Sequence, residues 1–71
     1  MGNQTNVIIK VFTGSHLYKM FTMEIDADDV LSEVCIPMSK EIFKVYDIAT
    51  RIKVECPERL KSPIVHMRGD L

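Results

Sequence analysis

Residues 28–43 read DDVLSEVCIPMSKEIF, and this stretch decides the fold because it begins and ends like a helix with Pro37 near its middle. Inside a continuous helix, a proline removes the amide that would bond the carbonyl four residues earlier, at a cost of about 3 kcal/mol. At the first turn of a new helix, the same residue costs little. The sequence therefore predicts one broken helix, or two short helices, divided at residues 36–38.

The residues on either side of the proline predict where each helical piece begins. Asp28 and Asp29 are expected to cap a first piece over residues 28–35, because aspartates accept hydrogen bonds from the free amides of a helix N-terminus. Ser39 is expected to cap a main helix over residues 39–50. The apolar residues that recur there at intervals of three and four, as a helix requires, are Ile42, Val45, Tyr46, Ala49 and Ile52.

Upstream of this stretch, the chain predicts a β-hairpin. Residues 7–13, VIIKVFT, are apolar on both faces, which is typical of a central strand. Gly14 and Ser15 form a two-residue loop whose leading glycine suits a type II′ turn. Residues 16–25, HLYKMFTMEI, are expected to be the return strand.

Simple alternation along the return strand predicts two faces. Tyr18 and Met20 are expected to share the outward face, which is apolar where a solvated strand is normally polar. The opposite face is predicted to hold Leu17, Phe21, Met23 and Ile25, with Lys19 as the exception.

Downstream, the chain predicts two short strands. Residues 51–56, RIKVEC, alternate apolar and charged side chains, the pattern of a half-buried strand. A loop bounded by Pro57 and Pro63 leads to a short final strand at residues 64–67, IVHM. The resulting order is ββαββ.

This order predicts an α+β fold in which helix packs on one face of one sheet. The chain of 71 residues is expected to be a single domain, residues 1–71. Residues 1–5 and 68–71 are expected to be flexible tails.

Size and composition together predict a partner. A domain this small buries only about 60% of the surface that its unfolded chain exposes, yet 46% of the residues are hydrophobic. A homodimer or a protein partner would cover the excess. We therefore expect a small regulatory protein, such as an inhibitor, that binds through Tyr18 and Met20 together with the predicted break at Ile36, Pro37 and Met38.

The alternative is a nucleic-acid-binding transcriptional regulator that uses the second half of the chain. Residues 1–39 hold two bases against five acids, and residues 40–71 hold seven bases against five acids. The whole chain has a net charge of −1, which gives no general attraction to nucleic acid. The candidate contacts in this alternative are Lys40, Lys44, Arg51 and Lys53.

Two family resemblances are local. Residues 9–14, IKVFTG, and 25–34, IDADDVLSEV, are similar to the hairpin and helix start of ubiquitin-like β-grasp domains, although the C-terminal diglycine of conjugated members is absent. Residues 34–55, with Ile36-Pro37, resemble the swapped-hairpin DNA-binding modules of transition-state regulators. Ala49-Thr50 replaces the Gly-Asp turn of that family. We assign the chain to neither family.

Nothing in the sequence predicts catalysis. Cys35, Cys56, His16 and His66 each stand alone, whereas structural zinc sites use closely spaced pairs of ligands. The three glycines are far apart and form no phosphate-binding loop. We expect no metal, no cofactor, no small-molecule substrate and no enzymatic activity.

The expected location is the cytoplasm, with reduced thiols. The polar start MGNQTN lacks the pattern of a secretory signal. No apolar stretch approaches the ~20 residues that a membrane helix needs.

Overall fold

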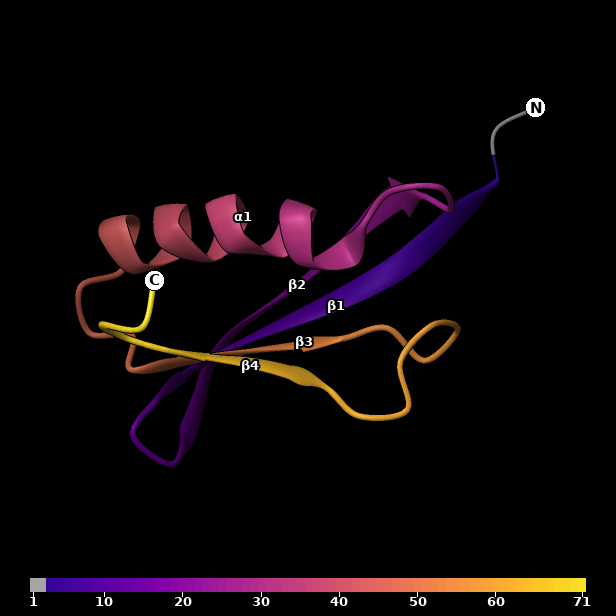
Figure 1. The fold of residues 1–71 in the computed structure, drawn as a ribbon. Coiled ribbons are helices and arrows are strands. Elements are labelled where there is room, and N and C mark those ends of the chain that lie inside the picture. The colour runs from indigo at the N-terminus through magenta and orange to yellow at the C-terminus, as the bar shows by residue number, and fades with distance from the viewer. Residues whose placement is uncertain (1–2) are drawn as a thin grey trace.

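The computed structural model describes residues 3–71 as one antiparallel sheet of four strands with one helix on one of its faces (Figure 1). The elements are β1 (Gln4–Thr13), β2 (His16–Asp26), α1 (Leu31–Val45), β3 (Arg51–Glu55) and β4 (Ile64–Met67). The strand order is β2-β1-β3-β4, so β2 and β4 form the two edges. The predicted α+β fold, its ββαββ order and the helix on one sheet face are confirmed.

The hairpin forms as predicted but contains a bulge. Gly14, first in the loop, has φ of +60°, the conformation that primed hairpin turns require there. The β1–β2 register shifts between Val11, which pairs with Lys19, and Phe12, which pairs with Leu17. Tyr18 is therefore the extra residue on β2, and it reverses the face of Leu17 while the residues from Lys19 onward keep theirs.

The core lies between α1 and the facing side of the sheet. Because side chains alternate along a strand, β1 and β3 each send every second residue into it. The helix adds one residue in every four, a single stripe along its axis. The buried residues of the strands and helix are Thr5, Val7, Ile9, Val11, Ile25, Leu31, Cys35, Ser39, Phe43, Ile52 and Val54.

The helix is continuous through Pro37, so the predicted break at residues 36–38 is wrong. Ile36, Pro37 and Met38 all lie within α1. Proline is tolerated because it occupies the solvent side: Pro37 is exposed, and so is Glu33, whose carbonyl would have received the missing amide. Burial of the opposite stripe against the sheet offsets the local cost and keeps the two halves in line.

The predicted caps at the start of the helix are also wrong. Val30 occupies the N-cap position and makes no side-chain hydrogen bond there. The Asp29 carboxylate instead accepts from the Asp26 amide, with 3.2 Å between Oδ2 and N. Ser39 is fully buried in mid-helix, with its Oγ 2.8 Å from Nδ1 of His66 on β4. The hydroxyl thus links the helix to the sheet.

The helix ends at Val45, five residues before the predicted end at residue 50. The Ala49 amide closes a turn on the Tyr46 carbonyl. The Thr50 amide then donates to the Phe12 carbonyl, 2.9 Å away. Hydrogen bonding to β1 therefore draws residue 50 toward the sheet and ends the helix before it.

Two arginines from the second half of the chain fix both ends of α1. Arg59 donates from a guanidinium nitrogen to the Asp29 carbonyl, 2.7 Å away, just before the helix begins. At the other end, Arg68 donates to three carbonyl oxygens, those of Phe43, Tyr46 and Ala49, at 3.0, 2.8 and 2.6 Å. The bonds to Phe43 and Tyr46 engage carbonyls of the last turn and the C-cap of α1, and the bond to Ala49 holds the turn that follows the helix.

Both predicted tails contain ordered contacts. Arg68 opens the predicted C-terminal tail, and its own amide donates to the Thr50 carbonyl. In the N-terminal tail, Gln4 and Thr5 belong to β1, and the Thr5 hydroxyl donates to Glu58, 2.5 Å away. Residues 1–2 lie outside the described residues. Among residues 3–71, no helix is long and apolar enough to cross a membrane.

Candidate functional site

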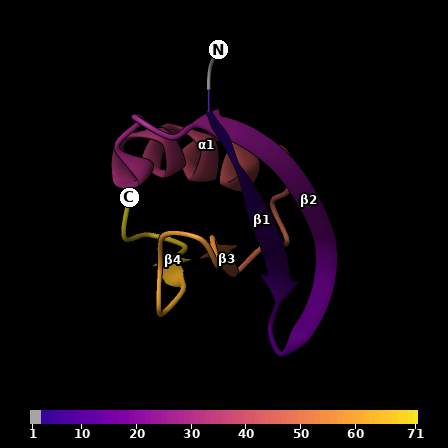
Figure 2. The same ribbon diagram turned by 90° about the vertical axis from the view of Figure 1, so that its right-hand side faces the viewer.

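The face of the sheet opposite α1 is left without a covering element. In Figures 1 and 2, the helix lies along one side of the sheet and no other described element packs on the far side. We call this far side the outer face. Strand alternation and the pairing registers assign to it Asn6, Ile8, Lys10 and Phe12 of β1, Leu17, Met20, Thr22 and Glu24 of β2, Arg51, Lys53 and Glu55 of β3, and Val65 and Met67 of β4.

Large apolar side chains lie on both flanks of the outer face. On the β2 side, Leu17 is 51% and Met20 is 58% exposed. On the β4 side, Val65 is 49% and Met67 is 45% exposed. Single exposed apolar residues are common on protein surfaces, but four on one uncovered face are the kind of feature that marks an interaction site.

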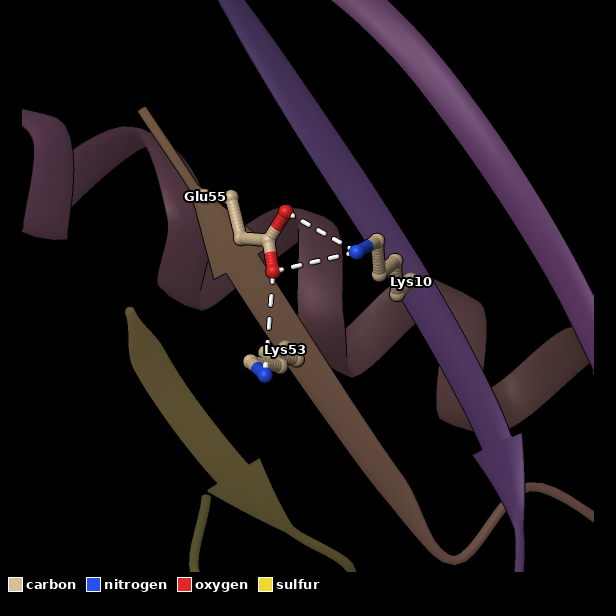
Figure 3. Close-up of polar contacts among 3 residues, drawn as sticks. All are labelled: Lys10, Lys53 and Glu55. Atoms are coloured by element: carbon tan, nitrogen blue, oxygen red, sulfur yellow. Dashed lines mark hydrogen bonds and ion pairs between the residues drawn. The ribbon is translucent and has the colours of Figure 1, made fainter. Parts of the chain in front are cut away.

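Charged side chains occupy the centre of the same face. Figure 3 shows Lys10, Lys53 and Glu55 on the near side of the sheet, with α1 behind it. Lys10 Nζ lies 3.0 Å from Glu55 Oε1 and 3.1 Å from Oε2. Lys53 Nζ lies 3.7 Å from Oε2 of the same carboxylate. Arg51 places its guanidinium carbon 4.4 Å from the centre of the Phe12 ring. Two lysines therefore contact one carboxylate, and Arg51 adds a third cation to the same face.

The hydrogen bond from Lys10 lowers the pKa of Glu55; desolvation opposes this, and the positive charges of Lys10 and Lys53 lower the pKa further, so the net shift is downward. A carboxyl with a depressed folded-state pKa stabilises the fold above its unfolded-state pKa. That stabilisation disappears as the pH falls through the folded-state pKa.

We expect the Glu55→Gln variant to be less stable than the wild type at neutral pH, and this difference to vanish on acidification. The pH window begins near the ordinary glutamate pKa of 4.5 and extends below it. Denaturant unfolding of both proteins between neutral and acidic pH measures the difference. If the stability difference between the two proteins persisted at acidic pH, the carboxylate charge would not be the cause of that difference.

A pocket of about 370 Å³ opens at the end of β3, beside the charged centre. Lys53 and Glu55 border it on the sheet side. The β3–β4 loop supplies the remaining walls, which combine apolar residues with a further lysine: Cys56, Pro57, Leu60, Lys61, Ser62 and Pro63. The pocket continues the outer face and adds a recess able to receive a single side chain of a partner.

The structure does not bring the five predicted partner-binding residues together. Met20 lies on the outer face. Tyr18 lies on the helix side, because the bulge turns it there and its ring centre is 5.8 Å from that of Tyr46. The prediction that Tyr18 and Met20 share a face is therefore wrong. Ile36 and Pro37 are exposed on α1, and Met38 packs partly against the core.

The bulge also moves a neighbouring residue. Leu17, predicted to face inward, pairs with Phe12 on the outer face. Phe21, Met23 and Ile25, which lie beyond the bulge, face the helix as predicted and pack into the core.

The four basic residues of the nucleic-acid alternative occupy two opposite sides of the molecule. Lys40 and Lys44 are exposed on α1. Arg51 and Lys53 lie on the outer face, one stacked on Phe12 and the other paired with Glu55. These four side chains form no continuous basic patch, and nucleic-acid binding stays a prediction.

The groups with reactive chemistry are enclosed. Cys35 and Cys56 are free thiols buried in the core, and burial, with a smaller effect of Cys56, raises the pKa of Cys35. The Ser39–His66 pair has a hydroxyl that no substrate can reach. Within residues 3–71, no group of three or more His, Cys, Asp or Glu side chains could hold a metal ion.

No protein-family model, curated protein or solved structure matches this chain. The β-grasp resemblance extends to the hairpin followed by a helix, and Ile36-Pro37 of the second resemblance lies inside α1. We therefore infer the candidate site from its geometry alone.

Sequence reasoning missed most of the outer face. The sequence predicts a strand that includes Val65 and Met67 but does not assign these two residues to a face. The signal for them was available in IVHM, where both alternating sets include large apolar residues, so one of the two sets must be exposed on an edge strand. The cation cluster left no such signal, because it requires β1 and β3 to be neighbours.

Proposed function

We propose that this chain is a non-catalytic protein-binding module that regulates a partner by occupying part of its surface. The observation that carries the proposal is the uncovered outer face, with exposed apolar side chains on both flanks of a charged centre. The interaction sites of proteins commonly combine apolar anchors with polar groups that fix orientation. As the sequence predicts, the proposed module is cytoplasmic and dimeric.

The charges of the outer face define the chemistry of the partner. At the centre of this face, Lys10, Arg51 and Lys53 outnumber Glu55, and Lys61 adds another cation at the pocket rim, while Glu24 lies farther along β2. A complementary surface therefore presents acidic groups between apolar side chains. The partner's apolar groups would cover Met20 and Met67, whose flexible thioethers adapt to irregular surfaces.

Removing the apolar flanks tests this proposal. We expect a Met20→Ser/Met67→Ser double variant to lose about thirtyfold in affinity for partners that the wild type captures, since each exposed anchor contributes about 1 kcal/mol on binding. The measurement is affinity capture from host extract with quantitative mass spectrometry, followed by titration of each captured protein.

The matched control is Val45→Ser/Ile48→Ser. These side chains are 61% and 49% exposed, similar to the methionines, but lie at the end of α1 and in the connection to β3. Partners lost from the methionine variant and retained by the control support binding through the outer face. Equal loss from both variants, or full retention by the methionine variant, would contradict it.

A further inference from the structure

The edges of the sheet are unequally protected. Exposed edge strands present unpaired amides and carbonyls to other chains, and proteins usually blunt them with short strands, bulges or inward-pointing charges. β4 has four residues. The part of β1 that extends beyond β3 contacts Glu58, whose carboxylate accepts a hydrogen bond from the Thr5 hydroxyl. β2 has eleven residues and forms the long border of the sheet (Figure 2).

Protection of β2 is confined to its first part. The bulge at Tyr18 distorts the edge there, and Lys19 points toward the helix side opposite Val11. Residues 20–25, MFTMEI, have a regular register with β1, and Glu24 is their one charge. An open, regular and largely apolar edge of this length is suited to pairing with another strand.

From these features, we propose that two copies of the chain pair antiparallel along residues 20–24 of β2, with Thr22 on the twofold axis. This inference rests on the dimeric part of the proposed function and names its interface. The outer face stays free for a different partner, because edge pairing extends the sheet sideways and leaves its faces uncovered.

Charge along the strand favours a second copy in this orientation. Lys19 lies near the start of β2, and Glu24 and Asp26 lie near its end. Antiparallel pairing about Thr22 places Lys19 opposite Ile25 of the other copy on the helix side and Met20 opposite Glu24 on the outer face, so no like charges meet. Parallel pairing would instead align like charges, which is unfavourable. The twofold axis repeats the favourable arrangement.

The register about Thr22 also matches side chains on each face. Residues directly opposite one another in antiparallel strands lie on the same face. Phe21 then meets Met23 of the other copy on the helix side, an aromatic–thioether contact that occurs twice. Both residues pack against their own core, so the pairing joins the two cores. On the outer face, Thr22 meets its own copy and Met20 meets Glu24.

Disulfide trapping tests this register. We expect the Thr22→Cys variant, oxidised with oxidised glutathione, to give a covalent dimer on a non-reducing gel, because residues opposite themselves on the axis lie within disulfide range. The native thiols are buried and free. The matched control is Met20→Cys, also on exposed β2. Its two copies would lie four residues out of register, about 13 Å apart along the strand, too far to bridge.

The outcomes separate the interface from the rest of the proposed function. Crosslinking of Thr22→Cys that exceeds that of Met20→Cys at least tenfold, with a dimeric wild type in sedimentation equilibrium, supports the interface. Equal crosslinking, or none for Thr22→Cys with a dimeric wild type, overturns the interface and leaves dimerisation standing. A monomeric wild type overturns both. Partner capture through the outer face is measured independently in every case.

Discussion

The Pro37→Ala variant is expected to be more stable than the wild type by about 2 kcal/mol. Alanine restores an amide that can bond the Glu33 carbonyl and removes the clash of the ring with the preceding turn, together worth about 3 kcal/mol in a helix interior. The wild-type proline offsets about 0.4–1 kcal/mol of this cost, because it restricts the conformations of the unfolded chain. Because Pro37 is exposed in α1, the smaller side chain leaves no cavity. Chemical denaturation of the two proteins measures the difference.

Ile36→Ala is the matched control for this prediction. It changes the neighbouring residue on the exposed side of the same helix and should alter the free energy of unfolding by no more than about 0.5 kcal/mol. The Pro37→Ala result also discriminates between two folds. A variant with unchanged or reduced stability would mean that the helix is broken at residues 36–38 in solution, as local sequence rules predict.

Local patterns were sufficient for the strands. Alternation in residues 51–56 predicted burial of Ile52, Val54 and Cys56, and all three are buried. The leading glycine of the hairpin loop and the short strand at Ile64–Met67 were also predicted. These features depend on side chains within a few positions of one another, where the period of two and turn chemistry decide.

Features that depend on contacts between distant segments could not be predicted in this way. Local rules separate the halves of α1 at Pro37 because they omit the sheet that holds both halves along one buried stripe. Ser39 resembled a cap because serine is common there, yet its partner is His66, twenty-seven residues later. The helix end depends on the bond between Thr50 and Phe12, thirty-eight residues apart.

The candidate site was predicted least well, for a related reason. Assigning faces to β2 assumes uninterrupted alternation, and one bulged residue reverses the assignment on one side of Tyr18. Of the five predicted partner-binding residues, Met20 alone lies on the outer face. The charged centre requires Lys10 and Glu55 to meet across β1 and β3, a pairing that no short-range pattern specifies.

The Arg68→Ala variant is expected to lose about 2 kcal/mol of stability, with a fall in Tm of about 8–16 °C for a domain of this size. Its guanidinium donates to three carbonyls at the end of α1 and lies 4.9 Å from the Phe43 ring centre. Removal leaves the carbonyls without these donors and removes a cation from the negative end of the helix dipole. Thermal and denaturant unfolding measure the loss.

Two variants separate the geometry of Arg68 from its charge. Arg68→Lys keeps the cation but lacks the planar set of donors that reaches three acceptors, so we expect it to recover less than half of the lost stability. Arg59→Ala removes one exposed hydrogen bond at the opposite end of α1 and should cost about 0.5–1 kcal/mol. If Arg68→Ala cost no more than Arg59→Ala, the three bonds would not act together as a helix cap. Full recovery by lysine would assign the effect to charge alone. The predicted order therefore requires that one side chain near the C-terminus cap the end of α1 and hold the helix to the sheet.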